Sequence, residues 1–559
     1  MKANFSQYPW LGCRTRPKPP PLACALPALL ALILLANREL ADAARPRVGT
    51  DPLGLAAEAA KALRALEAPT CGDAPDDVCA LPGLNGIPHV RMRSGYVTVS
   101  EPSGRKLWYL VADRETQQPS TEAEAEGEAG VGKGGRKNDD QASPVVLWLT
   151  GGPGCSSLDA FIYEHGPFSF SNGVNGDIFL SPNPYSWTKA ATMIYVDSPA
   201  GAGLSYSNDT EDYKTNDEYT IIDLVRFLEG LTARYPELAT APFFITGESY
   251  GGVYVPLLAT ALVKANKKRS GEGQPPLVNL QGYAIGNGVT DEEADGNAPL
   301  HFAAGMGFLD PGAWRRLREA CGDAFWNATK GSKCTELMVA AREGLKGMNP
   351  YNVLDPCTAS PKPAPGLLGL KAPADPYRLL FWPYAPRMEG HPDDGPSGRR
   401  LWGPGLRHVA PCMDRRIAME WLGREEVRSA LHAAPVRDWN WQPCSDIVHY
   451  DMVKADMAPL HEALVREGLR ALVYTGDHDM VVPHTGTRAW LFDKADLGGV
   501  EQPLRPWLMG GQVVGFTARF KAGSRLTFAS VKGAGHMVPQ SKPAEALYLF
   551  EAFLNNQDL

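Results

Sequence analysis

The chain lacks a surplus of basic residues, because 55 Lys and Arg stand against 63 Asp and Glu and leave a formal net charge of -8. A protein that binds DNA or RNA needs a basic surface to neutralise phosphates, so we expect no nucleic-acid partner. The eight cysteines that follow the N-terminal segment contain no tight C-x-x-C pair, and we therefore expect no zinc site. No motif implies another metal or an organic cofactor.

Long hydrophobic runs are also scarce. One apolar run, from Leu22 to Ala36, follows three basic residues between positions 14 and 18 and precedes small residues that end at Ala44. This order is typical of a secretory signal, so we assign residues 1–44 to a signal peptide cleaved near Ala43 or Ala44. The run is short for a membrane span, and a retained signal anchor is the alternative. We expect no stable membrane span in the mature chain.

Ten cysteines fit an oxidising compartment, and eight remain after removal of the signal. Sequons at Asn208 and Asn327 also favour passage through the secretory pathway, where both could carry glycans. We therefore expect a protein of the secretory pathway that resides in a vacuole or lysosome or outside the cell.

The order of patterns along the chain predicts an α/β fold. Buried strands at Val145–Leu149 and Met193–Val196 are followed by an amphipathic helix, Asp217–Tyr235, and alternation returns near the C-terminus. Strands that alternate with helices predict a mostly parallel central sheet. We assign residues 91–289 and 437–559 to this core.

Three further segments interrupt or precede this core. Residues 45–90 form an N-terminal arm or propeptide, and the polar residues 116–142 bury too little apolar surface to become ordered, so we expect a disordered insertion. Residues 290–436 change to short helices and contain four of the eight cysteines. We interpret them as an inserted, mainly helical, disulfide-linked cap, with a loop rich in Pro and Gly at 359–411.

A candidate nucleophile lies in the segment Gly247–Gly251, which has the pattern G-x-S-x-G around Ser249. An apolar strand precedes the segment and a helical pattern follows it. This is the setting in which a sharp turn exposes a strained serine hydroxyl. The alternative is an ordinary loop serine between glycines.

Two later loops provide an acid and a base. Asp479 follows the strand Ala471–Thr475, and His536 follows the strand Leu526–Val531. A serine needs an imidazole to take its proton, and the imidazole needs a carboxylate to orient it. The order Ser249, Asp479, His536 is that of the α/β hydrolases, so we predict an α/β-hydrolase fold.

The same loops contain rival residues: Asp477 and His478 lie beside Asp479, and His484 is close by in sequence. The acid of a hydrolase loop usually lies a few residues beyond the glycine that ends the strand, which favours Asp479. We expect the oxyanion formed by attack to accept hydrogen bonds from the backbone N–H groups of Tyr250 and Gly152.

Four motifs together resemble the serine carboxypeptidases, the lysosomal and vacuolar peptidase family. The likeness runs from Tyr96 to Phe553, apart from the acidic insertion and the proline-rich stretch. The motifs are Trp148–Ser157, Gly247–Gly252, Ile285–Gly288 and Gly533–Pro539.

This resemblance implies an exopeptidase that releases one C-terminal residue from peptides and proteins. It also implies that the substrate carboxylate is recognised by Thr150, the Gly151 N–H, Glu164 and Glu248. Threonine stands at position 150 where the family often has asparagine, so a hydroxyl replaces an amide donor. Two glutamates can face a carboxylate only if protons are shared among them, and we therefore expect peptide hydrolysis to be fastest at acid pH.

Further implications of the resemblance concern the cysteines, substrate preference and assembly. Met537 stands where some relatives have an acidic residue, which favours an apolar residue at the substrate C-terminus, and homodimers occur in the family. The implied disulfide pairs are Cys155–Cys444, Cys321–Cys334 and Cys357–Cys412, which leaves Cys71 and Cys79 to pair locally.

Two other functions use the same sequence features. One is acyl transfer to an alcohol, which needs the same triad. The other is a non-catalytic role as a stabilising partner of other lysosomal or vacuolar enzymes, which does not need Ser249.

Overall fold

The computed structural model describes most of the chain after residue 71, and the described residues belong to one compact unit, Ala68–Leu559. The signal peptide (1–44), the insertion 116–142, the loop 359–411 and Cys71 lie outside the described residues, as does the first part of the arm 45–90. The described residues are 72, 74–115, 143–173, 176–329, 331–357, 412, 414–433, 441–452, 456–521 and 525–559.

A single 10-stranded sheet organises the molecule, with strand order β1-β2-β6-β3-β8-β9-β11-β14-β13-β12. The six strands from β6 to β14 are parallel to one another, and the two strands at each edge of the sheet pair antiparallel. The strands are β1 (Met92–Ser100), β2 (Arg105–Ala112), β3 (Val145–Leu149), β6 (Thr192–Val196), β8 (Pro242–Glu248), β9 (Asn279–Gly286), β11 (Arg470–Gly476), β12 (Val500–Met509), β13 (Gln512–Phe520) and β14 (Leu526–Val531).

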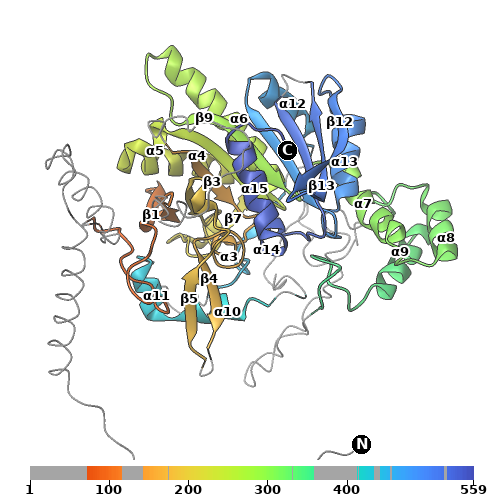
Figure 1. Ribbon diagram of the computed structural model, residues 1–559, viewed down its shortest axis with the longest axis horizontal. Coiled ribbons are helices and arrows are strands. Elements are labelled where there is room, and N and C mark those ends of the chain that lie inside the picture. The colour runs from red at the N-terminus through yellow and green to blue at the C-terminus, as the bar shows by residue number, and fades with distance from the viewer. Residues whose placement is uncertain are drawn as a thin grey trace, which may run out of the picture. The chain divides into compact units, whose positions relative to one another are not determined.

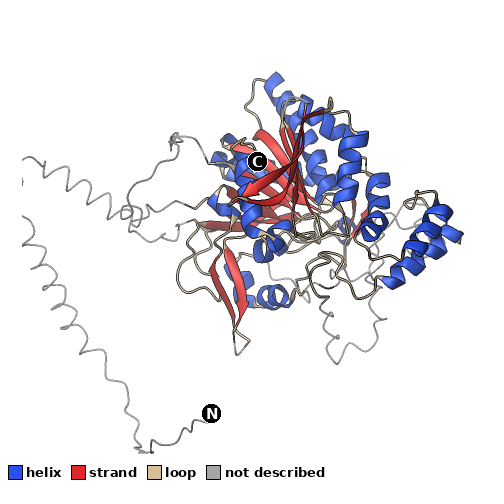
Figure 2. Cartoon of the chain, turned by 45° about the vertical axis from the view of Figure 1, so that its right-hand side comes forward, coloured by secondary structure: helices blue, strands red, loops and turns tan. Residues whose placement is uncertain are grey.

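The helices were expected between the strands, and they cover both faces of the sheet (Figure 2). Their bounds are α3 (Leu158–Tyr163), α4 (Asp217–Arg234), α5 (Pro236–Thr240), α6 (Gly251–Gly271), α7 (Glu292–Gly305), α8 (Pro311–Cys321), α9 (Lys333–Gly344), α10 (Arg416–Gly423), α11 (Glu425–Ala430), α12 (Ala458–Arg466), α13 (His484–Ala489), α14 (Val538–Ser541) and α15 (Pro543–Leu554). Short helical turns are η2 (Trp187–Lys189), η3 (Thr210–Tyr213) and η5 (Trp490–Lys494).

Alternation of side chains along the central strands creates two hydrophobic cores. In β3, all five residues are buried, with Leu147 in one core and Trp148 in the other. Parallel strands covered on both faces require such continuous apolar sequence. Helices α4, α6 and α12 contribute to the first core, and α3, α10, α11 and α15 contribute to the second. The prediction of an α/β-hydrolase fold with a mostly parallel sheet is thereby confirmed.

A third hydrophobic cluster joins helices α7, α8 and α9, which we call the cap helices. It contains Leu300, Leu317 and Met338, and also Met480 from the loop after β11. The cap helices lie to one side of the sheet (Figure 1). Helices α10 and α11 also fall within residues 290–436, but they pack in the second core under the sheet.

Two small sheets accompany the large one. The strands β4 (Phe168–Asn172) and β5 (Ile178–Pro182) form an antiparallel hairpin, and β7 (Lys214–Asn216) pairs in parallel with β10 (His449–Asp451). Among the described residues, no helix combines the length and apolar character that a bilayer crossing requires.

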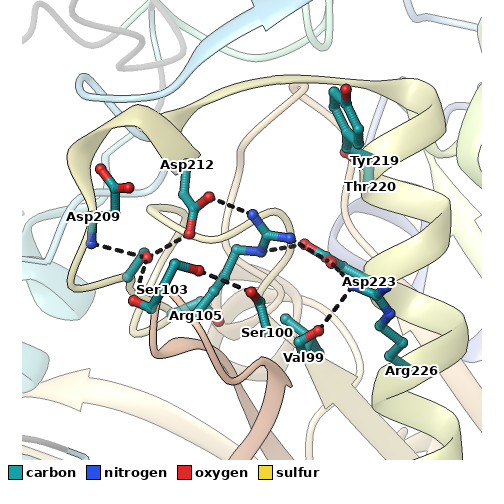
Figure 3. Close-up of polar contacts among 12 residues, drawn as sticks. Val99, Ser100, Ser103, Arg105, Asp209, Asp212, Tyr219, Thr220, Asp223 and Arg226 are labelled. Atoms are coloured by element: carbon teal, nitrogen blue, oxygen red, sulfur yellow. Dashed lines mark hydrogen bonds and ion pairs between the residues drawn. The ribbon is translucent and has the colours of Figure 1, made fainter.

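An ion-pair network joins strand β2, next to the edge strand β1, to helix α4 (Figure 3). Arg105 at the start of β2 binds Asp212 through Nη1 at 2.5 Å and Asp223 through Nε at 2.9 Å. From α4, Arg226 donates to the backbone oxygen of Val99 at 3.1 Å. Because Asp223 is buried, its carboxylate needs such a cation, and the network fixes α4 against the β1–β2 hairpin.

Candidate active site

Ser249 occupies the turn between β8 and α6 in a left-handed conformation, with φ of 57°. Such a backbone is strained for a residue with a side chain. Hydrogen bonds hold the turn: the Ser249 N–H donates to the Gly286 oxygen at 3.1 Å, and the Ser249 oxygen accepts from Gly252 and Val289. The sequence-predicted turn therefore has the geometry of a nucleophile elbow, with Ser249 half-buried at the end of a central strand.

The elbow fits only because its neighbours are small. A Cβ atom at Gly151 would lie 2.3 Å from the Tyr250 nitrogen and 2.9 Å from the Ser249 Cβ. The loop after β3 thus passes directly against the backbone on either side of Ser249. The buried Tyr250 is itself fixed, because its hydroxyl donates to the carboxylate of Asp217 at 3.1 Å.

Asp479 and His536 are in direct contact, although they come from different loops. His536 Nδ1 lies 2.7 Å from Asp479 Oδ2, and the side chains are 3% and 0% exposed. They follow β11 and β14, which are adjacent in the sheet, while Ser249 follows β8 at the same carboxyl edge. Ser249 and His536 make no hydrogen bond to each other in the described structure, as is common for such pairs in free enzymes.

The rival residues make other contacts. Asp477 accepts from the Gly533 N–H at 2.6 Å, and its Oδ1 lies 2.5 Å from Nδ1 of its neighbour His478. His484 begins α13 and packs edge-on against Phe302 of the cap helices. Of these acids and histidines, Asp479 and His536 are the pair that the two loops bring together.

Gly152, the second expected oxyanion donor, has φ of 109° in the loop after β3. A disulfide between Cys155 and Cys444 fixes this loop. The buried Asp197 also holds it by accepting from Ser156 Oγ at 2.7 Å and from the Ser157 N–H at 2.9 Å. Burial raises the pKa of Asp197 to about 6.

Glu164 and Glu248 form a buried carboxyl pair, with exposed fractions of 5% and 4%. Burial and the charge of nearby Asp159 raise the pKa of Glu164 to about 8. Burial and the charge of Glu164 raise the pKa of Glu248 well above its ordinary value. No N–H or hydroxyl donor among the described residues bonds to the Glu164 oxygens, so the available donor is a proton on the partner carboxyl.

An ion pair from the region before α10 lies beside these glutamates. Arg415 binds Asp159 of α3 through Nε at 2.7 Å and Nη2 at 2.8 Å, and its guanidinium lies 4.2 Å above the Tyr163 ring. Its positive charge opposes the rise of both glutamate pKa values.

The remaining predicted site residues are buried or lie in the same loops. Thr150 directly follows β3, and its Oγ1 accepts from Trp148 Nε1 at 2.8 Å, which leaves the hydroxyl proton free to point elsewhere. Met537 is buried directly after His536. Among the described residues, no group of His, Cys, Asp and Glu side chains is arranged to hold a metal ion.

Where both cysteines are described, the structure has three disulfides, in the pairs that the resemblance implies: Cys155–Cys444, Cys321–Cys334 and Cys357–Cys412. Cys79 is also disulfide-bonded, whereas Cys71 lies outside the described residues, so their pairing stays a prediction. Asn208 and Asn327 are both exposed, as glycan acceptors must be, and their glycosylation also stays a prediction.

Sequence reasoning missed two residues that contact the acid and the base. Asn287 donates to Asp479 Oδ2 at 2.8 Å, and the Tyr351 oxygen accepts from the His536 N–H at 2.6 Å. Asn287 belongs to the motif Ile285–Gly288, which the sequence analysis identified without predicting a role for this residue. Tyr351 lies in the region interpreted as the cap, where no local signal distinguishes it.

Comparisons with known proteins point to one family. A family model described as serine carboxypeptidase matches residues 82–556. Serine carboxypeptidase 1 of Hordeum vulgare is 40% identical over 502 residues, covering 86% of this chain and 93% of its own. The lysosomal protective protein of Mus musculus is 33% identical over 498 residues, covering 86% and 94%.

Among solved structures, a prohormone-processing carboxypeptidase from Saccharomyces cerevisiae aligns with a TM-score of 0.60 at 21% identity, covering 85% of this chain and 94% of its own. That similarity supports the fold. The family model and the two relatives cover most of the chain. The chain therefore belongs to the serine carboxypeptidase family and is a hydrolase that acts on peptides.

Proposed function

We propose that this protein releases single C-terminal residues from peptides at acid pH, through a triad of Ser249, Asp479 and His536. The observation that carries the proposal is the 2.7 Å contact between the buried Asp479 and His536, at the carboxyl edge of the sheet where the strained Ser249 also lies. A buried carboxylate that accepts from Nδ1 fixes the imidazole tautomer, so that Nε2 is free to take a proton.

In this mechanism, Ser249 Oγ attacks the carbonyl carbon of the last peptide bond while His536 takes the hydroxyl proton. The N–H groups of Gly152 and Tyr250 stabilise the resulting oxyanion. His536 then gives its proton to the leaving amine, which departs as the C-terminal amino acid. Water, activated by His536, hydrolyses the acyl-enzyme and restores the Ser249 hydroxyl.

The carboxyl pair Glu164 and Glu248 explains how the free C-terminus would be selected. With raised pKa values, the pair retains protons in acid, and a protonated carboxyl donates a hydrogen bond to the substrate carboxylate. Thr150 and the Gly151 N–H would supply further donors. As pH rises and the pair ionises, it repels the substrate, so peptide binding weakens.

The acid preference suits the compartments that the sequence indicates. One relative is named as a lysosomal protein, and the paired cysteines fit an oxidising environment. We therefore place this protein in the secretory pathway, in a lysosome or vacuole or outside the cell. Homodimerisation and a preference for apolar C-terminal residues, based on Met537, remain part of the proposal.

The decisive experiment measures residue release from blocked dipeptides with free or amidated C-termini, from about pH 4 to about pH 8. We expect release from the free-acid peptides to peak in acid. Ser249→Ala and His536→Asn should lower kcat by on the order of 10⁴-fold or more. The matched control is His478→Asn, which changes the rival histidine and should leave kcat within a few-fold of wild type.

Two results would contradict the proposal. If His478→Asn removed activity and His536→Asn did not, the assignment of the base would be wrong. If the folded wild type released no residue but formed esters from activated acyl donors and alcohols, acyl transfer would replace hydrolysis as its function.

A further inference from the structure

Asn287 lies directly after β9 and is fully buried, with φ of 41°. Asparagine is one of the few residues with a side chain that adopts this left-handed conformation readily. Its backbone N–H donates to the Tyr474 oxygen of the neighbouring strand β11 at 2.9 Å. The side chain is thereby aimed across the end of β11, toward the loop that contains Asp479.

The Asn287 amide bonds to the last residues of β11 and to Asp479 in the loop that follows. Nδ2 donates to Asp479 Oδ2 at 2.8 Å and lies 3.1 Å from Thr475 Oγ1, and Oδ1 accepts from the Gly476 N–H at 2.9 Å. These contacts fix the orientation of the amide, because only Oδ1 can accept from an N–H and only Nδ2 can donate to a carboxylate.

Asn287 and His536 bond to the same carboxylate oxygen. Asp479 Oδ2 accepts from His536 Nδ1 at 2.7 Å and from Asn287, while Oδ1 accepts from the Val481 N–H at 2.7 Å. Asp479 is 0% exposed, so its hydrogen-bond donors come from the protein. Donors that converge on a buried carboxylate restrict its rotation.

We propose that Asn287 is a positioning residue of the catalytic acid, which holds the Asp479 carboxylate directed at His536. This inference rests on the proposed role of Asp479. It assigns a function to the third residue of the motif Ile285–Gly288: a neutral donor that orients the acid, just as the acid orients the imidazole.

Other ionisable groups surround Asp479, and the test has to separate their titration from that of position 287. Asp477 and His478 precede it in its own loop, His484 lies at the start of α13, and Tyr351 and His536 approach from the segments packed against the loop. All of these groups are unchanged in the variants below, so a pH profile that differs from that of the wild type is caused by the substitution at position 287.

Two substitutions separate donation from packing. N287D keeps the shape of the side chain but can donate to Asp479 only while the introduced carboxyl is protonated. N287G permits the left-handed backbone and has no donor at any pH. The matched control is N266D, because Asn266 of α6 also joins a backbone N–H and a backbone oxygen, at 2.8 and 2.9 Å, but lies outside the site.

The measurement is kcat and KM from about pH 4 to about pH 8, on a blocked amino-acid ester that has no free carboxylate and so does not need the glutamate pair. Wild-type kcat should rise with pH, because a general base takes a proton only in its unprotonated form. The kcat of N287D should instead fall as pH rises, because two adjacent carboxylates repel each other and the donor is lost. N287G should be lower than wild type by about 10- to 100-fold at every pH, with little change in KM.

A purely structural role predicts something different. If N287D followed the wild-type profile, or if N287D and N287G were equally impaired at all pH values, the proposal would be overturned. An unchanged profile for N266D is required for either conclusion. Asp479→Asn distinguishes failure of the parent proposal: if that variant kept full activity, Asp479 would not be the acid at all.

Discussion

At the scale of single residues, the site depends on side chains kept in protonation states that water would not favour. The buried glutamates illustrate this, because the pKa of Glu164 is raised to about 8 and that of Glu248 also rises. Below these values the pair can donate to a carboxylate, and above them it repels one. The pH dependence of peptide binding should therefore originate here and not in the triad.

Replacing one of these acids tests that origin. Glu248→Gln substitutes an amide that donates at every pH, so the KM for free-acid peptides should stay low above about pH 7, where the wild-type KM rises several-fold or more. The measurement is KM and kcat against pH, with C-terminally amidated peptides as the control substrate. A variant that kept the wild-type rise in KM would show that another group controls binding.

At the scale of elements, the segment from Met348 to Cys357 joins the loops that contain the acid and the base. The Met480 N–H donates to the Pro350 oxygen, the Val353 N–H to the His478 oxygen, and the His536 N–H to the Tyr351 oxygen. The disulfide Cys357–Cys412 closes the far end of this segment. The positions of Asp479 and His536 therefore depend on residues about 130 to 190 positions earlier in the chain.

Removal of that disulfide should affect chemistry more than substrate binding. We expect Cys357→Ser with Cys412→Ser to lower kcat several-fold, because the segment loses a restraint next to His536, while KM changes little. The matched control is Cys321→Ser with Cys334→Ser, which removes a disulfide 13 residues apart that joins α8 to α9. If the control variant had the same Tm as the test variant and an equally lowered kcat, the loss of activity would come from a general loosening of the fold and not from the segment beside His536.

Most elements of the core were predictable from local sequence. The predicted bounds of β3 and β14 agree with the structure, because runs of mostly apolar residues mark them clearly. The hairpin β12–β13 was missed, since β12 contains two prolines and exposes Leu508. Contacts such as that of Asn287 with Asp479 span 192 positions and leave no periodic signal.

At the scale of the whole molecule, buried ionisable groups make stability depend on pH in two opposite ways. The pKa of Glu164 is raised to about 8 and that of Asp295 to about 7, mainly by burial, so the folded state keeps protons that the unfolded state loses. Their contribution is present in acid and is lost as pH rises. Burial lowers the pKa of His165 and His461 to about 3, so their contribution is lost as pH falls below about 6.5.

Together these groups should produce a Tm maximum at mildly acid pH. The measurement is calorimetric Tm from about pH 4 to about pH 8, for wild type and for the double variant Glu164→Gln, Glu248→Gln. The double variant should lose Tm less steeply toward pH 8, because two of the carboxyls that ionise there are gone. A wild-type Tm that rose steadily across this range would contradict the assignment.

Met480 limits how freely this architecture can be recombined. It follows the proposed acid directly, yet its side chain completes the hydrophobic cluster of the cap helices. A chimera that received α7, α8 and α9 from a relative would leave this side chain in a foreign cavity, one residue from Asp479. The cap helices are therefore not a detachable module, and their exchange has to include position 480.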